Sequence, residues 1–266
     1  MTRRFFLAAA SVSAFAQDIL TLAPPKPTAK IPYGKATQQF GFLYLPHGTG
    51  PHPAVLFIHG GFWRNNYSLD HAGHLCAALA RAGAAVWSLE YRRLGDPGGD
   101  WEGMSDDIVR GAQHLVPVAN RYSLDLKRVI AAGHSAGGQL ALWLAAQMAV
   151  DLRGVVPLAA ISDLRRAYAL QMDGGVVGQL MGGSPDRVPQ HYAAASPMEL
   201  LPISAPQRVV HGTADNIVPF DMSQRFAKAS KNAKLISLPG AGHFDLIDPR
   251  AKAWATVQKN ILDWDF

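Results

Sequence analysis

The stretch Gly133-His134-Ser135-Ala136-Gly137-Gly138 follows an apolar run at 128–132 and precedes a run of helix formers at 139–148. A G-x-S-x-G string between a strand and a helix is typical of a nucleophilic serine on a sharp turn. A side chain at Gly133 or Gly137 would clash with the neighbouring strand or helix. We therefore predict that Ser135 lies at the end of a buried strand and the start of a helix. The alternative is a glycine-rich loop with a solvated serine.

Apolar runs of strand length alternate with helical patterns on both sides of this turn. Strands are expected at 40–45, 54–58, 84–89, 128–132, 152–161, 207–210 and 233–238, and helices near 70–82, 101–119, 139–148, 218–230 and 251–264. Such alternation predicts an α/β fold with a mainly parallel sheet and helices on both faces.

The pattern divides the chain into a lead-in and one domain. Residues 17–36 carry four prolines and are expected to form an extended lead-in without a core of its own. One domain covers 37–266. Within it, 163–202 breaks the rhythm and is rich in glycine, which predicts a small helical lid inserted between two strands.

The first sixteen residues have the pattern of an export signal. Arg3 and Arg4 precede an apolar run that ends in small residues at Ala14 and Ala16, so we expect cleavage before Gln17. The paired arginines also resemble the twin-arginine consensus. The alternatives are an ordinary secretory signal or an uncleaved anchor. The apolar run itself is too short to span a bilayer. The expected location is periplasmic or secreted, and we expect no stable membrane insertion once the signal is removed.

Composition narrows the function classes. The chain has 266 residues, 48% hydrophobic and 17% charged, which is enough for one large core. The net charge is +5, but no basic cluster is interleaved with aromatic residues, so we expect no nucleic-acid partner. Cys76 is the sole cysteine, and His71 and His74 are interpreted as helix-surface or capping residues. No metal and no cofactor are expected, and the oligomeric state is left open.

Two later loops supply partners for the serine. His243, after the last strand, is the candidate base, because an imidazole can accept a proton near neutral pH and return it. Asp215, after the preceding strand, is the candidate carboxylate that orients the imidazole. His211 is an alternative base that we expect to be structural. The alternative carboxylates are Asp221, Asp245 and Asp248.

A glycine-rich loop, His59-Gly60-Gly61-Phe62-Trp63, follows an earlier strand. Negative charge on a carbonyl oxygen under attack needs preorganised N–H donors, and glycines let a backbone approach the substrate. We assign the donors to Gly61, Phe62 and Ala136, with Gly60 as a further candidate and His59 as a brace of the loop. Trp63 is either a loop anchor or a wall of the substrate pocket. The pocket is expected to be lined by Trp63, Tyr67, Tyr91 and lid residues such as Met172 and Met181.

Four motifs carry a family resemblance: H-G-G-x-W at 59–63, G-H-S-A-G at 133–137, H-G-x-x-D at 211–215 and G-x-x-H-F at 240–244. With them, the chain from residue 33 onward resembles the α/β-hydrolase superfamily, in which serine, acid and histidine occur in this order. More narrowly, it resembles the branch of esterase/lipase-like, feruloyl esterase-like and kynurenine formamidase enzymes. It departs from the hormone-sensitive-lipase branch at Phe62, where that branch has a third glycine.

The resemblance implies a serine hydrolase that cleaves a small-molecule carboxylic ester through an acyl-enzyme on Ser135. The alternative is an amide hydrolase, either an arylformamidase or a peptidase of the prolyl-oligopeptidase type, with Glu90 as a candidate to hold a peptide amino terminus. The export signal argues against the kynurenine formamidase role. A third hypothesis is a non-enzymatic binding protein on the same scaffold. Such a protein normally lacks a member of the triad, whereas all three candidate residues are present in this sequence.

Overall fold

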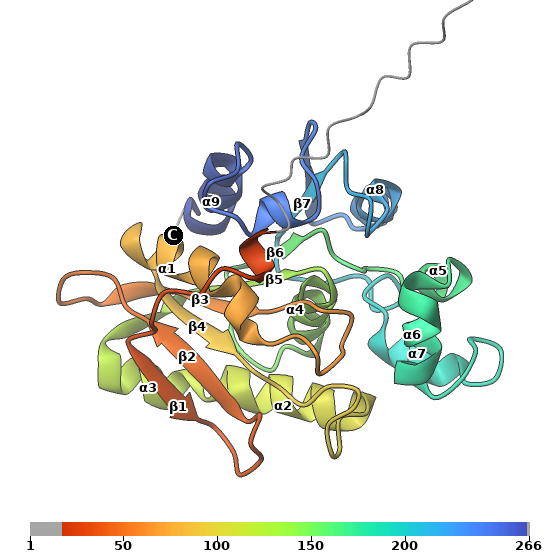
Figure 1. The fold of residues 1–266 in the computed structure, drawn as a ribbon, viewed down its shortest axis with the longest axis horizontal. Helices are drawn as coiled ribbons and strands as arrows, with labels where there is room; N and C mark the ends of the chain where they lie inside the picture. The colour runs from red at the N-terminus through yellow and green to blue at the C-terminus, as the bar shows by residue number, and fades with distance from the viewer. Residues whose placement is uncertain (1–17, 265–266) are drawn as a thin grey trace, which may run out of the picture.

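The computed structural model describes residues 18–264, so the predicted signal peptide at 1–16 lies outside the described residues. Eight strands form one sheet in the order β1-β2-β4-β3-β5-β6-β7-β8 (Figure 1). The strands are β1 (Ala29–Pro32), β2 (Phe40–Tyr44), β3 (His52–Ile58), β4 (Ala85–Leu89), β5 (Leu124–His134), β6 (Gly154–Leu158), β7 (Gln207–Gly212) and β8 (Ala233–Leu238). The β1–β2 and β2–β4 pairs are antiparallel and all the others are parallel, which confirms the predicted fold class.

Helices cover both faces of this sheet (Figure 1). The α-helices are α1 (Gly73–Arg81), α2 (Trp101–Gln113), α3 (Leu115–Tyr122), α4 (Ala136–Gln147), α5 (Leu164–Ala169), α6 (Met172–Met181), α7 (Pro189–Ala195), α8 (Phe220–Ala229) and α9 (Trp254–Leu262). Three short 3₁₀ helices are η1 (Asp18–Leu20), η2 (Leu69–Ala72) and η3 (Phe244–Leu246). None of the helices in residues 18–264 is both long and apolar enough to cross a bilayer.

The core is split into two layers by the alternation of side chains along the strands. In β3, Leu56 and Ile58 pack with α2, α3, α4 and α8, whereas Val55 and Phe57 pack with α1 and α9. Successive residues of a strand point to opposite faces, so a strand covered on both sides is apolar at every position. This is why the central strands appear in the sequence as continuous apolar runs.

The lead-in is more structured than the sequence predicts. Ala29 pairs with Leu43 in an antiparallel ladder, so β1 forms the edge of the sheet. Ile19, in η1, is only 1% exposed and belongs to the core layer of α1 and α9. Residues 18–36 therefore join the sheet and the core of the domain that was expected to begin at residue 37.

The helix predicted at 101–119 is two helices that meet at His114. Pro117 lies in the first turn of α3, where the absent N–H would have had no intrahelical acceptor. The insertion at 163–202 holds α5, α6 and α7, which group together at the right of Figure 1. Within α6, Asp173, Gly174 and Gly175 have left-handed backbone angles that interrupt the helix.

Candidate active site

Ser135 lies between β5 and α4 with φ 57° and ψ −120°, a strained conformation for a residue with a side chain. The surrounding glycines permit the turn. A Cβ at Gly133 would lie 2.1 Å from the carbonyl oxygen of Gly137, and one at Gly137 would lie 2.1 Å from that of Ile58 in β3. The elbow therefore packs against both the helix and the adjacent strand, as predicted. The serine is 3% exposed at the end of the strand.

The structure brings His243 and Asp215 together. The imidazole Nδ1 lies 2.7 Å from the carboxylate Oδ2, and both side chains are buried. Asp215 also accepts hydrogen bonds from the backbone N–H groups of Ile217 and Val218, at 2.9 and 2.8 Å. Because Nδ1 is engaged by the carboxylate, Nε2 is the nitrogen of His243 that remains for Ser135, and both residues line one cavity.

The environment keeps Asp215 ionised. Burial alone would raise the pKa of its carboxyl, but hydrogen bonds from His211 and His243 hold that pKa well below its usual range. A negative charge next to His243 fixes the tautomer of the imidazole and stabilises the imidazolium that forms when the histidine takes a proton. The pair is thus arranged as a base and its orienting acid.

The alternative bases and carboxylates have other partners. His211 contacts the Ser223 hydroxyl and the Asp215 carboxylate. Asp221 pairs with Arg166, Asp245 accepts from the backbone amide of Gly242, and Asp248 pairs with Arg250. His211 is fully buried, and its Nε2 lies 3.1 Å from the Asp215 carboxylate that also contacts His243, which favours the structural role over that of the base. None of the three alternative carboxylates has a described contact with the imidazole of His243.

A second buried histidine holds the loop of His243. The Nε2–H of His134 donates to the carbonyl oxygen of His243 at 3.0 Å, and the two rings lie 4.4 Å apart. Burial and the neighbouring His243 push the pKa of His134 well below its ordinary value. A neutral His134 can brace the catalytic loop without placing a positive charge beside the base.

The glycine-rich loop after β3 lies directly against the serine. A Cβ at Gly60 would be 2.7 Å from the carbonyl oxygen of His134 and 3.0 Å from Cβ of Ser135. Gly61 and Phe62 have φ values of 111° and 51°, and both line the serine's cavity. Ala136 is in the first turn of α4, where an N–H has no intrahelical acceptor. Gly61 and Phe62 thus line the cavity of Ser135 and Ala136 follows it in the chain, while their role as an oxyanion hole stays a prediction.

Buried side chains behind this loop fix its path. The Glu90 carboxylate accepts from Nε2 of His59 at 3.0 Å and pairs with Arg93 at 2.9 Å. The Tyr91 hydroxyl donates to the carbonyl oxygen of His59 at 2.9 Å. Oε2 of Glu90 accepts from the backbone N–H of Leu69 at 3.2 Å, so both oxygens of this buried carboxylate have partners within the domain, which argues against Glu90 as the group that holds a peptide amino terminus.

A further link joins the loop to the insertion. The indole N–H of Trp63 donates to Gln139 Oε1 at 3.0 Å, and the amide of Gln139 donates to the carbonyl oxygen of Ala195 at 2.9 Å. One turn further along α4, the indole N–H of Trp143 donates to the carbonyl oxygen of Ala194 at 3.0 Å. The loop and α7 are thus connected through α4.

The cavity at the serine has a volume of about 70 Å³. It is lined by Leu20, Gly61, Phe62, Tyr67, His71, His134, Ser135, Ile217, His243 and Phe244. Tyr67 was predicted to line it. Trp63, Tyr91, Met172 and Met181 were also expected there, but all four are buried and none lines the cavity. For Trp63 the structure favours the alternative, a loop anchor.

The sequence analysis did not assign five of the lining residues to the site: Leu20, His71, His134, Ile217 and Phe244. His71 was interpreted as a surface residue, yet it is buried, and its Nδ1 has no hydrogen-bond partner among the described residues. Burial, together with nearby His59, lowers the pKa of His71 to about 3. Helical spacing does not relate His71 to Tyr67, because Tyr67 precedes the 3₁₀ helix η2 (Leu69–Ala72) that holds His71.

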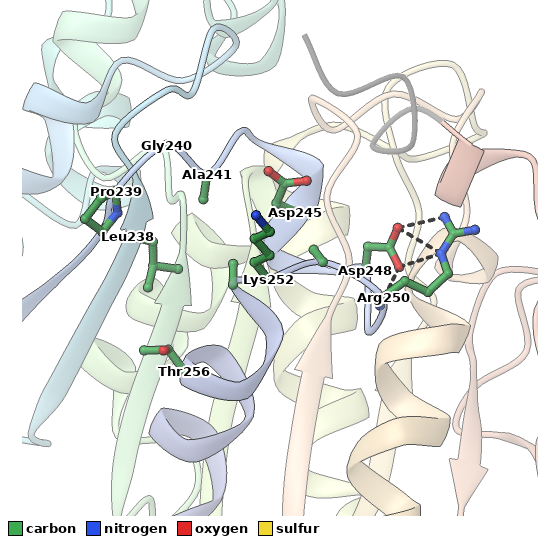
Figure 2. Close-up of a pocket in the computed structure, with 11 residues that line it drawn as sticks. Leu238, Pro239, Gly240, Ala241, Asp245, Asp248, Arg250, Lys252 and Thr256 are labelled. Carbon is green, nitrogen blue, oxygen red and sulfur yellow. Dashed lines mark hydrogen bonds and ion pairs between the residues drawn. The ribbon is translucent and has the colours of Figure 1, made fainter. Parts of the chain in front are cut away.

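A second cavity in residues 18–264, of about 750 Å³, is larger than the one at the serine (Figure 2). It lies beside the loop after β8 and the start of α9, and an ion pair between Asp248 and Arg250 stands at its wall (Figure 2). No triad residue lines it. Within the described part of the chain, no three His, Cys, Asp or Glu side chains are grouped so that they could hold a metal ion.

The mostly parallel sheet, the serine elbow and the histidine–aspartate pair define an α/β hydrolase. A family model described as BD-FAE matches residues 43–229, more than half of the chain. The chain belongs to the BD-FAE family.

Curated relatives include the kynurenine formamidase of Danio rerio, which is 31% identical over 142 residues, covering 51% of this chain and 46% of the relative. The esterase LipC of Mycobacterium tuberculosis is 27% identical over 227 residues, covering 75% of this chain and 55% of the relative. The chain therefore spans about half the length of these relatives.

Solved structures share the fold. The esterase B of Lactobacillus rhamnosis aligns with a TM-score of 0.77 at 20% identity, over 93% of this chain and 90% of that one. A truncated carbohydrate esterase from gut microbiota aligns with a TM-score of 0.75 at 21% identity, over 91% and 97% of the two chains.

Proposed function

We propose that this protein is a serine hydrolase that cleaves small-molecule carboxylic esters through an acyl-enzyme on Ser135. The observation that carries the proposal is the shared cavity: Ser135 and His243 line it together, and His243 is held at 2.7 Å by a buried, ionised Asp215. The esterases among the relatives and structural neighbours support the same chemistry.

The first half-reaction forms the acyl-enzyme. Nε2 of His243 takes the hydroxyl proton of Ser135 as Oγ bonds to the ester carbonyl carbon. The carbonyl oxygen becomes negatively charged and accepts hydrogen bonds from the backbone amides of Gly61, Phe62 and Ala136. The bond to the alcohol oxygen then breaks, and His243 gives its proton to the departing alcohol.

The second half-reaction releases the acid. Water attacks the carbonyl carbon of the acyl-enzyme while His243 accepts the water proton. The bond between the carbonyl carbon and Oγ breaks, and the proton returns to Ser135. Each donor of the oxyanion hole contributes roughly 3–4 kcal/mol to such a transition state, so a preorganised loop matters as much as the triad.

Replacing Ser135 with alanine tests the proposal. Hydrolysis of p-nitrophenyl acetate should fall by about a millionfold, because the nucleophile is lost and only the weak contribution of binding and the oxyanion hole remains. Ser105→Ala, in α2, is the matched control. An S135A variant that keeps most of its activity would contradict the assignment.

Amide hydrolysis is the second candidate, favoured by the relative named kynurenine formamidase. The same triad can attack an amide, with His243 protonating the departing nitrogen. Comparing kcat/KM for p-nitrophenyl acetate and N-formylkynurenine in the same preparation separates the two. A preference for the formamide would replace the ester proposal with the amide one.

A further inference from the structure

The segment 18–25 is fixed to the domain at two points beside the active site. At one end, Ile19 is buried in the core layer that also contains Leu75 and Leu246. At the other end, Pro24 packs so closely on Gly73, at the start of α1, that a Cβ at Gly73 would lie 2.5 Å from Cβ of Pro24. The residues between these two contacts are thereby held across the start of α1.

Leu20 lies between the two contacts and lines the cavity of Ser135. It is partly buried and packs against the core cluster to which Phe244 also packs. The other large side chains around the serine that are apolar or aromatic are those of Phe62, Tyr67, Ile217 and Phe244. Among residues 18–264, Leu20 is the one lining residue from outside the predicted domain at 37–266, so the lead-in contributes to the wall of the active site.

The size of the cavity limits what can bind next to the serine. One water-sized group needs roughly 10–15 Å³ of such space, so about 70 Å³ holds roughly five to seven groups. An acetyl, propionyl or butyryl group has few enough heavy atoms to lie within this volume, whereas an octanoyl group is larger than it and would have to extend beyond it. An aryl or sugar alcohol is also larger than this volume, so a short acyl group is the part of the ester that matches it best.

We propose that Leu20 determines specificity by closing the acyl end of the cavity, so that the protein prefers esters of butyric or shorter acids. This inference rests on ester cleavage at Ser135 and adds the acyl class to it. Removing the Leu20 side chain extends the cavity, and enlarging the side chain shortens it.

The test measures kcat/KM for p-nitrophenyl acetate, butyrate and octanoate, which vary only the acyl group. Leu20→Ala should lower the acetate-to-octanoate preference by about tenfold or more, because a few methylene groups of pocket space change discrimination by that amount. Leu20→Trp should lower the activity on butyrate relative to acetate. Leu22→Ala is the matched control, since Leu22 is in the same segment but 38% exposed, and its preference should change by less than about twofold.

Three results would overturn the inference. The preference could stay unchanged in both Leu20 variants, all three esters could lose activity equally in L20A, or L20A could alter selectivity only among acetates of different alcohols. If the wild-type protein hydrolyses none of the esters, the proposed function fails. In that case the role of Leu20 is tested by the rates at which methyl- and octylphosphonates label Ser135. If the ratio of the octylphosphonate rate to the methylphosphonate rate does not rise in L20A, the inference about Leu20 is overturned.

Discussion

Replacing His71 with phenylalanine should make the protein less sensitive to mild acid. His71 lines the active-site cavity, is 8% exposed, and leaves Nδ1 without a partner in residues 18–264. Burial is the main cause that lowers its pKa to about 3; nearby His59 lowers it further, while the Ser68 carbonyl and Glu90 act in the opposite direction. The folded protein therefore holds this imidazole neutral at pH values where the unfolded chain protonates it.

The size of the effect follows from proton linkage. In the unfolded chain His71 titrates near its ordinary pKa of about 6.5, so between about pH 6.5 and about pH 3 the unfolded state binds more protons. Its contribution to stability is complete above about pH 6.5 and is lost as the pH falls. At about pH 5 the loss is about 1.5 pKa units, or about 2 kcal/mol of unfolding free energy.

Urea unfolding followed by tryptophan fluorescence, at about pH 7.5 and about pH 5, measures the effect. The free energy lost between the two pH values should be about 2 kcal/mol smaller in H71F than in the wild type. Each protein is compared with itself at the two pH values, so the packing cost of the phenylalanine, which is the same at both, cancels. The contribution of His134 is common to wild type and H71F and cancels when their losses are compared. His47→Gln, at an exposed turn, controls for the loss of one histidine. Equal losses in wild type and H71F would refute the burial of a neutral imidazole at this position.

Two further substitutions test the support of the oxyanion loop. Glu90→Gln removes the buried charge that contacts both His59 and Arg93, so the free energy of unfolding measured in urea should fall by about 3–5 kcal/mol. Glu199→Gln, at an exposed pair with Arg165, is the control and should lower it by less than about 1 kcal/mol. Similar losses in the two variants would contradict the buried role of Glu90. Gly60→Ala places a Cβ 2.7 Å from the His134 carbonyl oxygen, so kcat on p-nitrophenyl acetate should fall about a hundredfold to a thousandfold with the fold retained. Gly183→Ala, where the new Cβ meets nothing closer than 3.4 Å, is its control, and an unchanged kcat in G60A would show that the loop can move without loss.

The turn at Ser135 and its pairing with Asp215 and His243 could be predicted from the sequence because the features that determine them are local. Glycines next to Ser135 report the close approach of backbone, and apolar runs report strands buried on both faces. Once the strands are parallel, their carboxyl ends share one edge of the sheet, which brings the loops of Asp215 and His243 together. The motif spacing therefore contained most of the site.

The side chains around the motif could not be predicted in the same way. Trp63 follows a glycine-rich loop, and an aromatic residue there can face either the substrate or the core. The choice is made by Gln139, far away in the sequence, which accepts the indole N–H. His71 is on a single 3₁₀ turn too short to show a periodic pattern. Leu20 belongs to a proline-rich segment that packs on elements distant in the sequence, so neither periodicity nor composition indicates its position.

The two hydrogen bonds from α4 to the insertion have a consequence for the substitutions that this region can accept. Gln139 and Trp143 both donate to backbone carbonyl oxygens of α7, those of Ala195 and Ala194. A carbonyl is present whatever the side chain, so substitutions at the exposed Ala194 that preserve the helix also preserve both links. The exposed surface of α7 can therefore vary in sequence, in nature or in the laboratory, while α4 keeps the same hold on Trp63.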